Sequence, residues 1–151
     1  HRLNRRQRQM CIRDRFYCHN NEFHAANSSD AKRFGYIKNE WDLPMGLKKI
    51  YEEFDFFNNS KIVTIDLFGH TPGSIGLLVN LDKNQFLLAS DAVSLLRNLE
   101  FEEVPKNAWN KAELLKSYQK IKKLSQKKIN LICGHDYLQW NQNFKLGIEY
   151  Y

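Results

Sequence analysis

Three residues with metal-binding side chains stand at corresponding points of this sequence, each just past a short apolar segment. They are His70, Asp91 and His135. Imidazole nitrogens and carboxylate oxygens are common ligands of zinc and related ions, so three of them together would make a transition-metal site. Each residue also has a simpler interpretation: His70 as a surface loop histidine, Asp91 as a cap on the next segment, His135 as a solvated turn residue. Only their shared position favours the metal site.

The elements before these residues predict that the side chains meet. Residues 61–68 and 74–81 are rich in β-branched and apolar residues and read as strands with a short loop between them, so they should be antiparallel. A tight turn at 82–84 leads to a third strand at 85–90, antiparallel to the second. The first and third strands therefore run in the same direction.

A helix at 111–125 should return the chain to the same side of the sheet. Its apolar residues recur at helical spacing: Leu114, Leu115, Tyr118, Ile121 and Leu124. Such a crossover usually connects parallel strands, so a buried strand at 129–133 should run parallel to 85–90. Three strands then end at one edge of the sheet, where Gly69 and Gly134 allow tight turns.

The remaining pattern is less regular. Residues 16–19 read as a short strand and 20–22 as a helix cap, 45–53 as a short helix, and 93–110 as a long connection. Cys133 lies on a buried strand, and we expect a core role for it. Trp41, Trp109 and Trp140 could line an acyl pocket, but packing roles are the commoner outcome for tryptophans.

The charge of the chain argues against a nucleic-acid partner. The net charge is +6, but residues 1–15 carry six arginines and one aspartate, which leaves only +1 for the rest. A nearly neutral body gives no basic face. No apolar run has the length of a membrane span and no signal peptide is visible, so we expect no membrane partner and a cytoplasmic location.

Residues 5–15 resemble the translation of a transposase adapter used to prepare DNA sequencing libraries. The match covers all eleven residues, from Arg5 to Arg15, and the segment has no apolar period or cap. We therefore interpret residues 1–15 as a non-native tail and residues 16–151 as part of one domain. A basic arm and a targeting presequence are the alternatives.

The metal-binding residues lie in a recognisable set of motifs. Gly-His-Thr-Pro-Gly-Ser at 69–74, Ala-Ser-Asp-Ala at 89–92 and Gly-His-Asp at 134–136 resemble, in order and spacing, the second half of the metallo-β-lactamase superfamily signature. Residues 98–100 and 103–105 are similar to those of the N-acyl homoserine lactone hydrolases, the quorum-quenching lactonases. The resemblance covers residues 16–151 and identifies them as the C-terminal portion of such a fold.

The resemblance implies an α+β fold, part of an αββα sandwich, with two divalent metal ions that are usually zinc. His70 would bind the first ion, Asp91 would bridge the two and act in catalysis, and His135 would bind the second. Residues 71–74 would fix the His70 ring. A metal-bound hydroxide would then attack the carbonyl of a small ester or lactone and open an acyl homoserine lactone ring.

Two departures from the family pattern matter. The His-x-His-x-Asp-His block, which supplies four further ligands, is absent, and none of His1, His19 and His24 reproduces it. The chain as written should therefore bind metal weakly, lack activity and, with apolar faces exposed, tend to aggregate. Lactonases of the closest type also carry a tyrosine where this chain has Ser94, and Tyr137 is one candidate substitute.

Two other functions stay open beside the lactonase. One is another hydrolase of the same superfamily, such as a glyoxalase-II-like thioesterase, and the other is a non-catalytic relative used for binding. The sequence does not give the oligomeric state.

Overall fold

The computed structural model describes residues 15–42 and 46–144. Of the predicted non-native tail only Arg15 falls within these ranges, so that prediction lies outside the described residues. The chain divides into two compact units, His1–Tyr51 and Glu52–Tyr151. Among the described residues, no helix is long and apolar enough to cross a bilayer.

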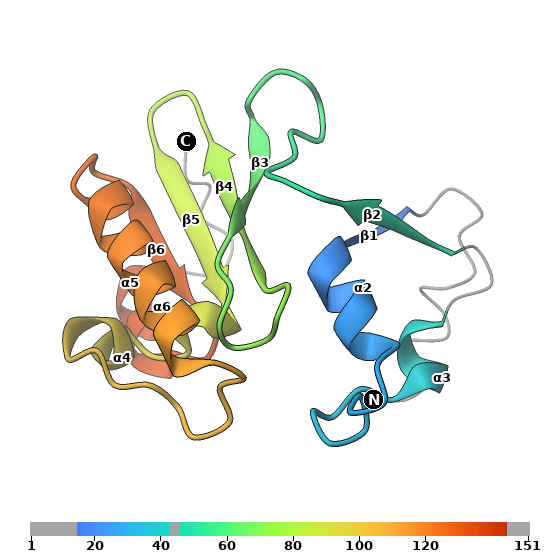
Figure 1. Ribbon diagram of the computed structural model, residues 1–151. Coiled ribbons are helices and arrows are strands. Elements are labelled where there is room, and N and C mark those ends of the chain that lie inside the picture. The colour runs from blue at the N-terminus through green and yellow to red at the C-terminus, as the bar shows by residue number, and fades with distance from the viewer. Residues whose placement is uncertain (1–14, 43–45, 145–151) are drawn as a thin grey trace. The chain divides into compact units, whose positions relative to one another are not determined.

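The first unit is built on two short parallel strands. Strand β1 (Phe16–His19) pairs with β2 (Leu47–Ile50), and helices α2 (Asn20–Ala26) and α3 (Lys38–Trp41) lie between them in sequence (Figure 1). The Phe23 ring meets the Trp41 ring edge to face, with centroids 6.0 Å apart, and the Lys49 ammonium lies 3.9 Å from the Phe23 centroid. These contacts hold the α2 helix between β2 and α3.

The structure corrects two predictions in this unit. The helix predicted at 45–53 is wrong, because Leu47–Ile50 forms β2, and pairing with β1 outweighs the helical spacing of Leu47 and Ile50. Helix α2 is confirmed, but its cap is His19, whose Nδ1 accepts the backbone N–H of Asn21 at 3.2 Å.

The second unit is a four-stranded sheet in the order β3-β4-β5-β6. Its strands are β3 (Ile62–Asp66), β4 (Ile75–Asn80), β5 (Gln85–Ser90) and β6 (Asn130–Cys133). The first two pairings are antiparallel and the pairing of β5 with β6 is parallel. The predicted strands and their directions are confirmed, and β3, β5 and β6 end at the same edge of the sheet (Figure 1).

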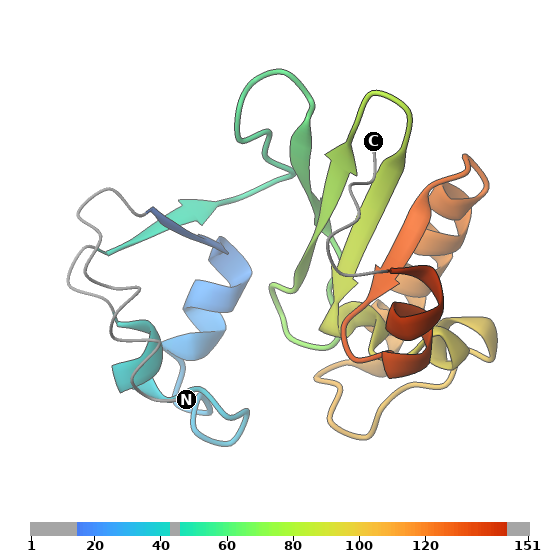
Figure 2. The same cartoon turned by 180° about the vertical axis from the view of Figure 1, so that it is seen from behind.

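Helix α5 (Lys111–Ser125) covers one face of this sheet, as both Figure 1 and Figure 2 show. The Asn110 side chain caps it, accepting the N–H groups of Ala112 at 2.9 Å and Glu113 at 3.2 Å. One stripe of the helix is buried, and it packs with inward residues of the strands into a single core. The fully buried residues include Leu67, Leu87, Ala89, Val93, Leu114, Tyr118 and Ile121.

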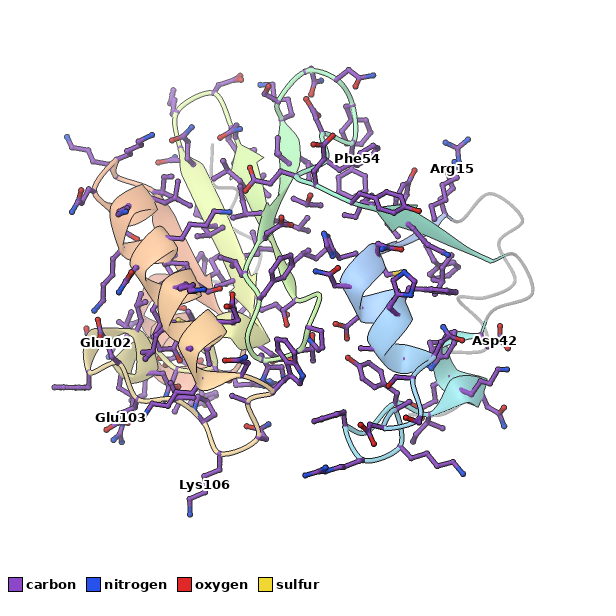
Figure 3. The ribbon with its side chains drawn as sticks, viewed as in Figure 1. Arg15, Asp42, Phe54, Glu102, Glu103 and Lys106 are labelled. Atoms are coloured by element: carbon purple, nitrogen blue, oxygen red, sulfur yellow. The ribbon has the colours of Figure 1, made fainter. Side chains whose placement is uncertain are left out.

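The connection from β5 to α5 is more ordered than predicted. It contains a 3₁₀ turn, η1 (Asp91–Val93), and a short helix, α4 (Leu96–Glu100), which the sequence pattern did not indicate. Beyond α4 the chain is tied back by two ion pairs, Arg97 with Glu103 at 3.0 Å and Lys122 with Glu102 at 2.8 Å. Glu102 and Glu103 lie on this connection, and Lys106 points away from the fold (Figure 3).

The face of the sheet opposite α5 is apolar and only partly buried. Side chains alternate between the two faces of a strand. Leu88 of β5, its partners on β4 and β6, and the residues two positions away on each strand therefore share this second face. The apolar ones include Leu77, Val79, Phe86, Leu88 and Ile132, all of intermediate exposure, and the exposed Asn130 lies beside Phe86 on the same face. Partly exposed apolar rows of this kind favour self-association, and the aggregation expected from the sequence stays a prediction.

Truncating a residue of the α5-facing core should cost far more stability than truncating its neighbour on the second face. We expect Leu87→Ala to lower the free energy of unfolding by about 2–5 kcal/mol, because Leu87 is fully buried. The matched control, Leu88→Ala, removes the same atoms from a partly exposed site and should cost clearly less. Urea unfolding followed by circular dichroism measures both, and equal losses would contradict this division of the faces.

Candidate metal centre

The first candidate ligand, His70, lies in a turn closed by its own polar groups. The Leu67 N–H donates to the Ser74 carbonyl at 3.0 Å, and the hydroxyl oxygens of Thr71 and Ser74 are 2.7 Å apart. The sequence predicted that residues 71–74 fix the His70 ring. Instead Thr71 and Ser74 bond to one another, and His70 Nδ1 is buried with no hydrogen-bond partner in the described part of the chain.

The second candidate, Asp91, follows a break in the β5 ladder. The register between β5 and β6 shifts between Leu88 and Ser90, and Ser90 adopts a φ of +51° and a ψ of −142°. A positive φ at serine costs about 1–3 kcal/mol and persists only when neighbouring structure enforces it. The bulge turns the chain so that Asp91 starts η1 at the edge of the sheet.

The third candidate, His135, is held against that same segment. Gly134 N–H donates to the Val93 carbonyl and His135 N–H to the Ser94 carbonyl, both at 2.9 Å. A Cβ at position 134 would lie 2.7 Å from the Ser90 carbonyl oxygen and 3.2 Å from Asp91 Oδ1. Glycine is therefore required for β6 to end this close to the bulge.

Asp136 secures the other side of His135. As the cap of helix α6 (Tyr137–Asn143), it accepts the Gln139 N–H at 2.9 Å, and its second oxygen accepts the Leu96 N–H of α4 at 2.8 Å. These backbone donors, from Gln139 and then Leu96, lower the pKa of Asp136 below its usual value. The carboxylate thereby joins the exit of β6 to α4.

Gln139 completes the support of β6. Its side-chain amide accepts the Cys133 N–H at 2.9 Å and donates to the Leu131 carbonyl at 3.0 Å. Since β6 is the last strand of the sheet, this amide takes the place of a neighbouring strand. Cys133 itself is buried, and burial raises the pKa of its thiol to about 12, which confirms the predicted core role.

The structure brings the three predicted residues together. His135 Nε2 lies 2.8 Å from Asp91 Oδ1, and His70 Nε2 lies 3.9 Å from Asp91 Oδ2. Asp91 therefore stands between the two imidazoles and presents a different oxygen to each. The His70 side chain is 18% exposed, that of Asp91 45% and that of His135 69%. Solvent therefore reaches His135 most easily and His70 least.

This arrangement fits a pair of metal ions in part. A carboxylate with one oxygen toward each of two imidazoles has the donor chemistry of a bridging ligand. In the described residues, however, no group of three or more His, Cys, Asp or Glu side chains is spaced to hold a single ion. The three residues thus supply part of a donor set, and their role as metal ligands stays a prediction.

Sequence reasoning missed three supporting residues: Asp136, Gln139 and Ser117, whose hydroxyl donates to the carbonyl of Phe68, two residues before His70. A signal existed for Ser117, which lies three residues after Leu114 and four before Ile121 and so must share their buried face. Asp136 also carried a signal, because aspartate directly before a helix is a common cap. For Gln139 we find no local signal, since its partners are backbone groups of a strand edge.

A side chain at position 134 should separate Asp91 from His135. We expect Gly134→Ala to lower stability by about 1–3 kcal/mol, because the new Cβ meets backbone atoms of Ser90 that cannot rotate away. The His135 ring signals in the NMR spectrum should shift as the hydrogen bond to Asp91 lengthens. An alanine variant with unchanged stability and unchanged ring signals would refute this packing.

Comparison with known proteins agrees with these features. No protein-family model matches the chain. An N-acyl homoserine lactonase, AttM of Azorhizobium caulinodans, is 28% identical over 125 residues, which are 78% of this chain and 47% of the relative. The chain thus spans about half the length of the curated relative that it matches.

Solved structures give the same picture. An N-acyl homoserine lactone hydrolase with the product N-hexanoyl-L-homoserine at its catalytic metal centre matches with a TM-score of 0.73 and 24% identity, over 87% of this chain and 51% of that one. AidC, a dizinc quorum-quenching lactonase, matches with a TM-score of 0.56 and 15% identity, over 78% of this chain and 41% of that one. At these identities the structures establish the fold.

The strand order, the motifs at the three strand exits and these matches lead to one conclusion. The chain is a metallo-β-lactamase-fold protein of the α+β class that resembles the N-acyl homoserine lactone lactonases and aligns with about half of their length.

Proposed function

We propose that the protein containing this chain is a metal-dependent hydrolase that opens the lactone ring of N-acyl homoserine lactones. The observation that carries the proposal is the cluster of His70, Asp91 and His135 at one edge of the sheet, with one carboxylate oxygen toward each ring. The similarity of the chain to lactonases, with 28% identity to AttM, supports the choice of substrate.

In this proposal His70, Asp91 and His135 would be ligands of two divalent ions, of which zinc is the expected one. Bound there, zinc would polarise the ester carbonyl and acidify a water molecule. Asp91 sets the spacing of the two rings, because its oxygens face Nε2 of His135 and Nε2 of His70. The sheltered His70 and the exposed His135 leave the approach to the carboxylate open on the His135 side.

The surroundings of the cluster suit a small ester or lactone with an apolar substituent. Tyr137 and Leu138, in the first turn of α6, are 74% and 69% exposed and come two and three residues after His135 along the chain. Ser94, which stands where similar lactonases have tyrosine, uses its carbonyl to hold His135. Tyr137 is our candidate for the tyrosine that Ser94 replaces. Because that tyrosine is absent at position 94, a thioester remains the alternative substrate.

We also infer that these 151 residues have no activity by themselves. Each oxygen of Asp91 faces one imidazole, so the described cluster offers each ion two donors, whereas zinc in proteins takes four. Weak binding follows, because metal affinity rises with the number of preformed ligands.

The decisive experiment compares this chain with the longer protein from the intact gene. With zinc added, we expect the longer protein to open N-hexanoyl homoserine lactone and the 151-residue chain to show no turnover, with ring opening followed by chromatography. S-lactoylglutathione hydrolysis measured in parallel separates lactonase from thioesterase. A zinc-loaded longer protein that leaves the lactone intact would rule out the lactonase.

Substitution of Asp91 tests the role of the cluster in that longer protein. Asp91→Asn should lower kcat/KM by at least about 100-fold, because loss of even an outer partner of a metal ligand costs 10–100-fold. The matched control is Asp82→Asn, at the opposite end of β5, where the carboxylate only pairs with Lys61 at 2.7 Å. Equal activities of the two variants would remove Asp91 from the mechanism.

A further inference from the structure

Helix α5 holds the turn that carries His70 through three consecutive carbonyl groups. The Ser117 hydroxyl donates to the Phe68 carbonyl at 2.6 Å. The N–H groups of Asn110 and Trp109, at the start of the helix, donate to the carbonyls of Gly69 at 2.9 Å and His70 at 3.0 Å. The main chain from 68 to 70 is thus held at every carbonyl by α5 or by the two residues directly before it.

The turn also lies directly on the helix backbone. Gly69 has a φ of +129°, and a Cβ there would overlap the backbone nitrogen and Cα of Leu114. This close approach leaves no space for the turn to shift toward α5, and the three hydrogen bonds oppose a shift away from it. The position of the His70 Cα is therefore determined by α5.

The His70 ring has little other support. Its Nδ1 is buried and has no partner among the described residues, and its Nε2 is 3.9 Å from Asp91 Oδ2, too far for a hydrogen bond. A ligating histidine usually has its second nitrogen fixed by a carbonyl or a carboxylate. Here the direction of the ring depends on the main chain that carries it.

Among the three anchors, Ser117 alone acts through its side chain. It is buried, with 5% of its surface exposed, in the second turn of α5. A serine inside a helix commonly bonds to the carbonyl four residues earlier. Ser117 bonds instead to Phe68 across the interface between helix and turn, so its hydroxyl serves the turn.

We propose that Ser117 is a positioning residue for His70, aligning the imidazole with Asp91 by holding the Phe68 carbonyl. This proposal rests on the proposed function, in which His70 and Asp91 are aligned in order to bind metal. Without the hydroxyl, the turn keeps its two contacts to the helix start but loses the one on the β3 side of His70. The ring then samples a wider range of directions.

The test compares Ser117→Ala with Ile121→Val in the full 151-residue chain. Ile121 is fully buried one turn further along the same helix, so its truncation weakens the core without touching the turn. Two quantities are measured: the ring signals of His70 in the metal-free chain by ¹H–¹³C NMR, assigned through His70→Gln, and Zn²⁺ affinity by competition with a chromophoric chelator. Urea unfolding provides the stability of each variant.

We expect Ser117→Ala to shift or broaden the His70 ring signals and to weaken Zn²⁺ binding by about tenfold, as found when an outer support of a ligand is lost. Ile121→Val should leave both unchanged at a similar loss of stability. Ring signals unaffected by Ser117→Ala, or affected equally by the two variants, would overturn the proposal. Failure of the proposed function would show in the longer protein, as an intact lactone after zinc loading. Should these 151 residues bind Zn²⁺ too weakly to measure, the metal-free ring signals alone decide the role of Ser117.

Discussion

The parallel pairing of β5 with β6 is the constraint on which the cluster depends. Asp91 and His135 are 44 residues apart, and their side chains meet because both strands run the same way and end at the same edge. A parallel pair needs a crossover connection, and α5 provides it while burying one face of the sheet. The same helix then carries the anchors of the His70 turn, so one element both closes the core and aligns the site.

Close approach of backbones distinguishes this edge from an ordinary strand end. The bulge at Ser90 and the packing of Gly134 against it bring the exits of β5 and β6 together, and Gly69 brings the His70 turn onto α5. Each contact requires a strained φ or a residue without a side chain, which costs stability in the folded state. Strained backbone held by surrounding structure is commonly found at functional sites, and here Ser90 directly precedes Asp91 and Gly69 directly precedes His70.

Sequence reasoning succeeded where local pattern and topology agree. The boundaries of Gln85–Ser90 and Lys111–Ser125 follow from turn residues and apolar period, and strand direction then placed His70, Asp91 and His135 at one edge. It failed for Leu47–Ile50, whose strand exists through pairing with Phe16–His19, a contact that no local pattern encodes. The supports of His135 were missed as well. Asp136 had a local signal only as a helix cap, whereas its bond to α4 and the bonds of Gln139 to β6 join backbone groups that no local pattern indicates. The sequence therefore predicted where His70, Asp91 and His135 lie on the sheet. It did not predict the hydrogen bonds that orient their side chains.

The exposure of the three donors indicates how the two halves of such a centre differ. His70 is sheltered, and its main chain is fixed at three carbonyls, whereas His135 is open to solvent and its ring bonds directly to Asp91. In the proposed function, an ion at His70 would meet a ring whose place is already set by α5, with little entropy left to lose. An ion at His135 would first have to displace Asp91 Oδ1 from the ring nitrogen. The His70 side of the cluster is therefore the more preorganised one, and the turn on α5 is the physical reason.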